Sequence, residues 1–315
     1  QNVVLQFNDP TDYSSVLNGV RKKEPSKAYG RGLIDLGNIF EFQTAYPYKE
    51  EKLTEFIKVV SKKLNDVCAI KAPKIPILPS VVTLDNVEEK YNKMDEIPIG
   101  IEKETLQIAT INMDRLDSIV VTGDEVEENP EFITGLAKVF SNINNSNVIL
   151  MDAISSLKQK DSNNIIYDKS DCTKTYNMIK ELYNKEKITS KTNPESLKKL
   201  PVTICIINGI TALQAKLSFE DKTNLGNIIK DSKELKTFKF VIIDNLNNIK
   251  SIAYDDWFKN SIDLGEGIWI GSGLGDQFTL KVTTSSRELR EEIDSKFGYV
   301  ITRGKAVQVK LIIDE

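Results

Sequence analysis

The stretch that decides the fold runs from Ser118 to Pro130 and reads SIVVTGDEVEENP. Its first part is a short apolar run of mainly β-branched residues that ends at Gly123, which is typical of a buried strand. An acidic loop follows. Asn129 and Pro130 then favour a helix start, because an asparagine oxygen can cap the first turn and proline suits the first helical position. The sequence therefore predicts a strand, a loop and a helix from Pro130 to about Asn144.

The rest of the chain repeats this alternation. The apolar segments NVILMD, VTICII and FKFVII are separated by helical stretches near 171–187, 209–217 and 220–235. Alternating strands and helices favour a parallel sheet that is covered on both faces. The segments after Gly267 favour antiparallel strands: GIWIG, QFTLKV, a short helix from Ser286, and YVITRGKAVQVKLI with a hairpin turn at Arg303-Gly304. The predicted class is α/β, with a mostly parallel central sheet and antiparallel C-terminal strands.

A strand that ends in glycine before a helix is where P-loop NTPases grip phosphate, through GxxxxGK followed by Ser or Thr. Gly123 supplies the first glycine of that pattern. The second glycine is replaced by Glu128, the lysine by Asn129 and the hydroxyl residue by Pro130. The cation that neutralises the phosphates and the magnesium ligand are therefore both lost.

Two further features disfavour nucleotide. The loop carries four carboxylates, Asp124, Glu125, Glu127 and Glu128, which would repel phosphate. VTICII should end in acidic residues that hold magnesium and activate water, but it ends in Asn208-Gly209. The sequence thus predicts a nucleotide-binding fold that no longer turns over nucleotide, with no catalytic residue, no cofactor and no metal in this domain.

Composition excludes other chemistries. With 42 basic and 46 acidic residues the net charge is −4, the wrong sign for a chain that coats nucleic acid. There is no histidine, which excludes His-dependent nucleophiles and zinc sites. The three cysteines are dispersed, as expected for reduced thiols. The longest uninterrupted apolar runs are four residues, too short to cross a membrane.

Three segments are predicted along the chain. Residues 1–48 read as strand, short helix, strand and strand, which echoes the order predicted near the C-terminus. Residues 49–80 read as a linker, with an amphipathic helix and a segment that contains Pro73, Pro76 and Pro79. Residues 81–315 hold the alternating pattern. We expect residues 1–48 to be the closing elements of a preceding domain.

Longer phrases carry a family resemblance. AYGRGLIDLGNIFEFQTAYPY, IPILP, IPIGIEKETLQIATINM before SIVVTG, GIWIGSGLGDQFTLKV and FGYVITRGKAVQVKLI resemble the C-terminal part of the EssC family. These are membrane-anchored FtsK/SpoIIIE-type coupling proteins of type VIIb secretion systems, similar to EccC, in which several ATPase-like domains follow one another. The resemblance implies that the chain holds the end of the second such domain and all of the third, with a RecA-like P-loop NTPase fold.

The resemblance also implies a role. It places the domain in the cytoplasm beneath a membrane anchor that precedes this fragment, with ATP and Mg²⁺ used by other domains of the parent protein. The implied partners are secreted helical-hairpin proteins of the WXG class, effectors and the neighbouring ATPase domain. Of the family's phosphate motif only Gly123 is matched, so we expect a silent module that recruits or positions exported proteins.

Two alternatives stay open. One is a working ATPase with a non-standard site, in which Lys103 or Arg115 replaces the missing lysine. The other is a DNA translocase module, which the acidic charge disfavours. For a partner surface the sequence offers the aromatic residues Tyr254, Trp257 and Phe258, whereas Trp269 lies in a predicted strand and is expected to be buried.

Overall fold

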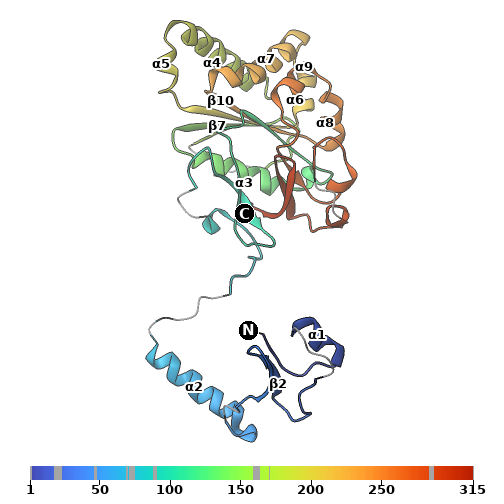
Figure 1. Cartoon of the computed structure of the whole chain (residues 1–315). Coiled ribbons are helices and arrows are strands. Elements are labelled where there is room, and N and C mark those ends of the chain that lie inside the picture. Colours follow the sequence, from blue (N-terminus) through green and yellow to red (C-terminus); the bar gives the residue numbers. More distant parts are fainter. Residues whose placement is uncertain are drawn as a thin grey trace. The chain divides into compact units, whose positions relative to one another are not determined.

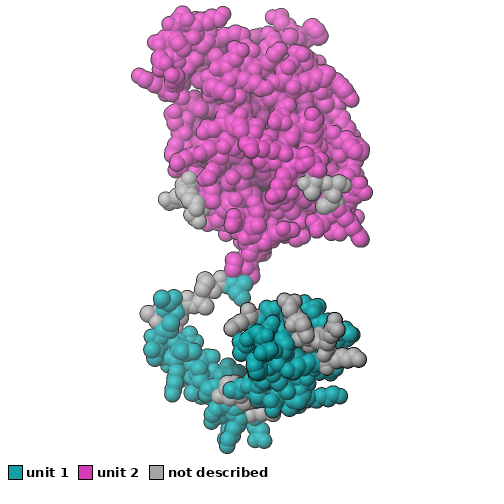
Figure 2. Space-filling model, in the orientation of Figure 1, with its two compact units in different colours: residues 1–75 teal, residues 76–315 magenta. Residues whose placement is uncertain are grey.

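The computed structural model describes residues 2–17, 23–45, 48–68, 70, 75–87, 91–158, 164–169, 171–283 and 287–314. The chain divides into two compact units, residues 1–75 and residues 76–315 (Figure 2). In the part of the chain that is described, no helix is both long and apolar enough to span a bilayer.

One mixed sheet organises residues 76–315. Within the described residues its strand order is β5-β4-β13-β12-β11-β6-β10-β9-β7-β8. The parallel part comprises β6 (Ser118–Thr122), β7 (Ser146–Asp152), β8 (Ile165–Lys169), β9 (Val202–Asn208), β10 (Phe238–Ile243) and β11 (Gly267–Ile270). The antiparallel part comprises β4 (Ile97–Glu102), β5 (Ile108–Ile111), β12 (Phe297–Thr302) and β13 (Lys305–Leu311). The predicted α/β class and the antiparallel C-terminal strands are confirmed.

Helices cover both faces of the sheet (Figure 1). On one face lies α3 (Pro130–Ser141), and Ile119 and Val121 of β6 share its core cluster. Val120, between them, joins the core cluster of the other face, as the period of two along a strand requires. The second face is covered by α4 (Thr173–Thr192), the short α5 (Pro194–Leu197), α6 (Ile210–Lys216), α7 (Phe219–Leu235), α8 (Leu246–Ile252) and α9 (Asp256–Ser261).

The unit of residues 1–75 has a small sheet of its own. It holds β1 (Val3–Val4), β2 (Arg31–Asp35) and β3 (Ile39–Gln43), all antiparallel, with α1 (Tyr13–Val16) and α2 (Leu53–Val67).

Short 3₁₀-helices occur in both units, at Pro10–Asp12, Glu50–Lys52, Leu84–Asn86, Val126–Glu128, Leu274–Asp276 and Arg287–Arg290. That residues 1–48 close a preceding domain stays a prediction; Pro73 and Ser286 lie outside the described residues.

The predicted strand QFTLKV is wrong, because Gln277–Val282 is irregular. The Gln277 side chain accepts a hydrogen bond from the Leu280 amide at 2.8 Å and donates to the Leu280 carbonyl at 3.0 Å. A side chain that satisfies nearby backbone groups competes with a sheet ladder. The internal echo therefore fails at its first C-terminal strand, whereas the antiparallel pair β2 and β3 has its counterpart in the antiparallel pair β12 and β13.

The hairpin between β12 and β13 generates a stability prediction. Arg303 and Gly304 have φ angles of 50° and 77°, and a Cβ on Gly304 would lie 2.8 Å from Thr283 Cγ2. We expect Gly304→Ala to lower the free energy of unfolding by about 1 to 2 kcal/mol, because an L-residue is strained in this conformation. Urea unfolding followed by tryptophan fluorescence measures the change, because both tryptophans, Trp257 and Trp269, lie in residues 76–315. Arg303→Asn, which suits the same turn, serves as the control and should not destabilise.

Candidate functional site

The candidate site is the edge of the sheet where the parallel strands end. Ligands of open α/β sheets bind outside the carboxyl ends of the strands. Gly123 follows β6, Asp244 follows β10, Asn208 ends β9 and Asp152 ends β7. Because β10 lies between β6 and β9, Gly123 and Asn208 are two strands apart, a separation of roughly 10 Å.

The loop after β6 closes on itself. Its single 3₁₀ turn, Val126–Glu128, places the Val126 side chain in the core with 1% of its surface exposed. The amide of Glu128 donates to the Glu125 carbonyl at 3.1 Å, and the amide of Asn129 donates to the Val126 carbonyl at 3.3 Å. In a phosphate-binding loop such amides point at the ligand. Here these two are used within the loop.

The predicted capping role of Asn129 is wrong. Asn129 occupies the N-cap position of α3, but its side chain makes no capping hydrogen bond. Its Nδ2 atom donates instead to the Glu125 carbonyl at 2.9 Å, and the residue is buried. The preceding 3₁₀ turn holds Asn129 close to Glu125, so the amide turns back into the loop. Pro130 is the first helical residue, as predicted.

Gly123 is explained by packing. A Cβ at this position would lie 2.1 Å from the carbonyl oxygen of Ile270, in the neighbouring strand β11. No side chain fits at that distance. The glycine is therefore required where β6 and β11 end side by side, whether or not a phosphate is bound.

Asn208 belongs to a buried polar network. With 2% of its surface exposed, it donates from Nδ2 to Asp152 Oδ1 at 2.8 Å and to Ser156 Oγ at 3.0 Å. Asp152 is fully buried, and its Oδ2 atom also accepts from the Leu157 amide at 2.9 Å and from the Tyr167 hydroxyl at 3.2 Å. Burial and the nearby Asp152 charge raise the pKa of Tyr167 to about 12. The network fills the position predicted to lack a magnesium ligand, beside Gly209, the N-cap residue of α6.

The sequence analysis missed Asp152, although its position directly after the apolar run VILM was a usable signal. It also missed Asp244, whose Oδ2 atom accepts from the Thr211 amide at 3.0 Å and the Thr211 hydroxyl at 2.7 Å. Glu127 accepts from Asn245 Nδ2 at 2.6 Å. These acids serve as caps and loop ties. Among the described residues no group of three acidic or thiol side chains is placed to hold a metal ion.

Neither cation of the alternative ATPase site lies at this edge. Arg115 precedes β6, and its guanidinium pairs with Glu266 at 2.5 Å, where β11 begins. Lys103 follows β4, which runs opposite to β6 through the antiparallel pairs of the sheet. Both therefore lie at the edge where the parallel strands start. Their proposed role beside Gly123 is excluded by position.

The predicted partner surface is only partly exposed. Tyr254 has 81% of its surface exposed, and the Lys259 ammonium lies 5.4 Å from the centre of its ring. Trp257 is half-buried against α7, whereas Phe258 has 1% exposed and belongs to the core. The prediction that Phe258 lies on the partner surface is thus wrong. Adjacent residues of a helix point in different directions, and Phe258 lies on the inner face of α9. Trp269 is buried, as expected.

This strand order and the helices on both faces define a P-loop NTPase-like fold. More particularly, the fold is that of the ATPase domains of EssC and EccC. No family model matches the chain, and no curated protein is significantly similar to it in sequence.

Three solved structures document the likeness. "EssC (ATPases 2 and 3)" from Geobacillus thermodenitrificans has a TM-score of 0.63 at 18% identity, over 98% of this chain and 60% of that one. Thermomonospora curvata EccC (ATPases 2 and 3), in complex with a signal sequence peptide, has 0.59 at 16%, over 93% and 54%. The cytoplasmic domain of EssC has 0.60 at 16%, over 92% and 59%. This chain therefore spans little more than half the length of these structures.

The buried network generates the next prediction. Asn208→Asp replaces a donor with a second carboxylate facing Asp152, so we expect a loss of about 3 to 5 kcal/mol in unfolding free energy at neutral pH. Two facing carboxyls share a proton, which raises their pKa in the folded state. The folded variant then binds more protons than the unfolded chain, and part of the stability should return as the pH falls.

Urea unfolding of Asn208→Asp at pH 7.5 and pH 5 measures both effects. Asn147→Asp, an exposed position at the start of β7, is the matched control and should change little. A variant as stable as the wild type at both pH values would contradict the network.

Proposed function

We propose that the chain carries a catalytically silent ATPase-like domain of a type VII secretion coupling protein, which helps recruit or position secreted WXG-class and effector proteins for export. The supporting observation is the Asn208 amide bonded to Asp152 at the position where a magnesium-binding acid would lie. An amide in place of an acid carries no charge to hold the magnesium ion on which phosphoryl chemistry depends, which supports a silent site.

The loop after β6 supports silence on energetic grounds. A phosphate charge about 6 Å from a carboxylate loses roughly 2 to 3 kcal/mol at an effective dielectric near 20, and Asp124 and Glu128 are exposed in this loop. A ligand of micromolar affinity binds with only about 8 kcal/mol. Opening the loop to free its amides would also expose Val126, at a cost of about 1.5 to 3 kcal/mol.

The likeness to the EccC structure supports a role in recruitment, since that protein was captured with a signal sequence peptide. A domain of this fold can therefore serve a polypeptide. The likeness to the cytoplasmic domain of EssC supports a place in the cytoplasm beneath a membrane anchor. We infer that ATP and Mg²⁺ act in other domains of the parent protein, and that a DNA partner is disfavoured by the net charge of −4.

A nucleotide-binding measurement tests the proposal that this domain is catalytically silent. We expect calorimetry of the 315-residue chain with Mg²⁺ and a non-hydrolysable ATP analogue to give no saturable heat up to millimolar concentrations, because the loop is both closed and acidic. An EssC or EccC fragment with an intact phosphate loop is the positive control. Micromolar binding, or phosphate release above background, would favour the alternative of an active ATPase with a non-standard site.

The partner surface is tested separately. If Tyr254 and Trp257 contact an exported protein, Tyr254→Ala should weaken capture of a purified WXG-class protein at least tenfold while changing the unfolding free energy by less than about 0.5 kcal/mol. Biosensor titration measures the capture. Phe278→Ala removes an aromatic that is 94% exposed on another loop and is the matched control. Equal losses in both variants, or none in either, would remove Tyr254 from the recruiting surface.

A further inference from the structure

A small cavity lies at the amino edge of the sheet, where β7 and β9 begin, opposite to the edge that holds the candidate site. It is a cavity of about 270 Å³ between the C-terminal half of α4, α5 and these strands. Its walls are formed by Asn147, Leu182, Lys185, Glu186, Thr189, Ser196, Leu200, Pro201 and Thr203. The volume is below the 300 to 1,000 Å³ typical of sites for drug-sized molecules. It suits a group the size of one side chain.

Glu186 is the unusual member of this cavity. It has 4% of its surface exposed, and its buried Oε2 atom has no hydrogen-bond partner among the described residues. Burial raises the pKa of Glu186, and the nearby Thr237 hydroxyl and Lys185 charge only partly offset this. A buried carboxyl oxygen without a donor is costly, so it calls for a function or a ligand.

The hydroxyl groups beside Glu186 present lone pairs. Thr189 donates its single hydroxyl hydrogen to the Lys185 carbonyl at 2.9 Å, and Ser196 donates its own to the Asn193 carbonyl at 2.8 Å. Neither hydroxyl has a second hydrogen to offer, so both can act toward the cavity only as acceptors. Leu182, Leu200 and Pro201 supply an apolar wall.

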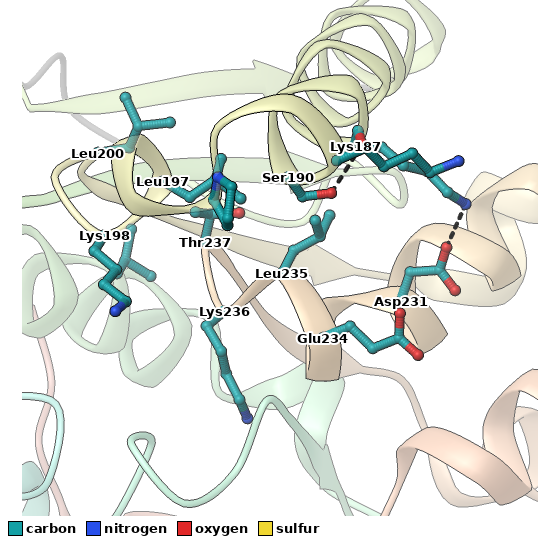
Figure 3. Close-up of a pocket in the computed structure, with 13 residues that line it drawn as sticks. Lys187, Ser190, Leu197, Lys198, Leu200, Asp231, Glu234, Leu235, Lys236 and Thr237 are labelled. Carbon is teal, nitrogen blue, oxygen red and sulfur yellow. Dashed lines mark hydrogen bonds and ion pairs between the residues drawn. The ribbon is translucent and has the colours of Figure 1, made fainter.

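An adjoining cavity of about 670 Å³ shares Leu200 and is lined by Thr237, whose hydroxyl is the one that lowers the pKa of Glu186 (Figure 3). Its charges are largely neutralised already. Lys187 pairs with Asp231 at 2.7 Å, Lys198 with Glu195 at 2.9 Å and Lys236 with Asp117 at 2.8 Å. The unsatisfied acceptors of this region therefore centre on Glu186.

We propose that the smaller cavity binds an alkylammonium or alkylguanidinium group, with its stem against Leu182, Leu200 and Pro201 and its cationic head on Glu186. The Glu186 carboxylate and the Thr189 and Ser196 hydroxyls are acceptors for the N–H groups of such a head, and a charge-assisted hydrogen bond to Glu186 is the strongest of these contacts. The exposed Lys185, which also lines this cavity, repels the cation and limits the affinity. The same chemistry is offered by a free amine and by a Lys or Arg side chain of a bound polypeptide. This site does not rest on the proposed function.

Calorimetric titration of the whole chain with n-butylguanidinium and n-butylammonium chloride tests the proposal, with n-butanol as the neutral isostere. We expect at least one of the two cations to bind saturably to the wild-type chain. Its affinity should exceed that of n-butanol at least tenfold, and the Glu186→Gln variant should bind the cation at least tenfold more weakly than the wild type. Glu181→Gln, at an exposed position of the same helix, is the matched control and should bind normally. Binding should weaken as the pH falls, because a proton then competes for Glu186.

Two further arms keep the test decisive. Thermal unfolding of the wild-type chain should shift upward with the organic cation and not with an equal concentration of KCl; an equal shift would assign the site to a simple ion and overturn the proposal. A peptide with one central lysine, compared with its acetyl-lysine form, separates a polypeptide source from a free amine. No saturable binding of either cation to the wild type, or unchanged binding in a folded Glu186→Gln variant, also overturns it.

Discussion

A hydrogen bond between the Asn208 amide and the Asp152 carboxylate joins the ends of β9 and β7 at the edge where sheets of this class hold their ligands. Asp152 is fully buried and accepts hydrogen bonds from four donors, namely the Asn208 side chain, the Leu157 amide, the Tyr167 hydroxyl and, at 3.3 Å, the Ser156 amide. A buried charge needs such compensation from some source. Here the donors come from the chain itself.

The two edges of the sheet differ in this respect. At the carboxyl edge the acids Asp152, Asp244 and Glu127 all have donors within the chain. At the amino edge Asp117 is paired with Lys239 at 2.7 Å, but Glu186 keeps a buried Oε2 atom without a hydrogen-bond partner among the described residues. The acids of the carboxyl edge are therefore satisfied within the chain, although the Thr122 hydroxyl at the end of β6 is also buried without a partner among the described residues.

Much of this arrangement could be predicted from the sequence, because each buried strand is a short apolar run bounded by polar residues. The runs at β6, β7, β9 and β10 fixed the class and the edge at which Gly123 and Asn208 lie. The partners of Asn208 could not be predicted, since the adjacency of β7 and β9 is a tertiary fact and Asp152 is 56 residues away in the chain. The predictions of a strand at QFTLKV and of an exposed Phe258 failed for a related reason. Local pattern does not show whether a Gln277 side chain will satisfy its own backbone, or which of two adjacent aromatics faces the core.

A residue at a phosphate-loop position can be required by phosphate binding or by the packing of the sheet, and this chain separates the two requirements. Glu128, Asn129 and Pro130 depart from the nucleotide pattern, and none of them makes a contact that demands glycine, lysine or a hydroxyl. Gly123 alone fits the pattern, and it is the position where the Ile270 carbonyl leaves no space for a Cβ. The one residue that fits the pattern is thus the one that packing requires in this sheet, where β11 lies beside β6. A glycine at this position is evidence for the fold, and the chemistry must be judged from the residues that packing leaves free to vary.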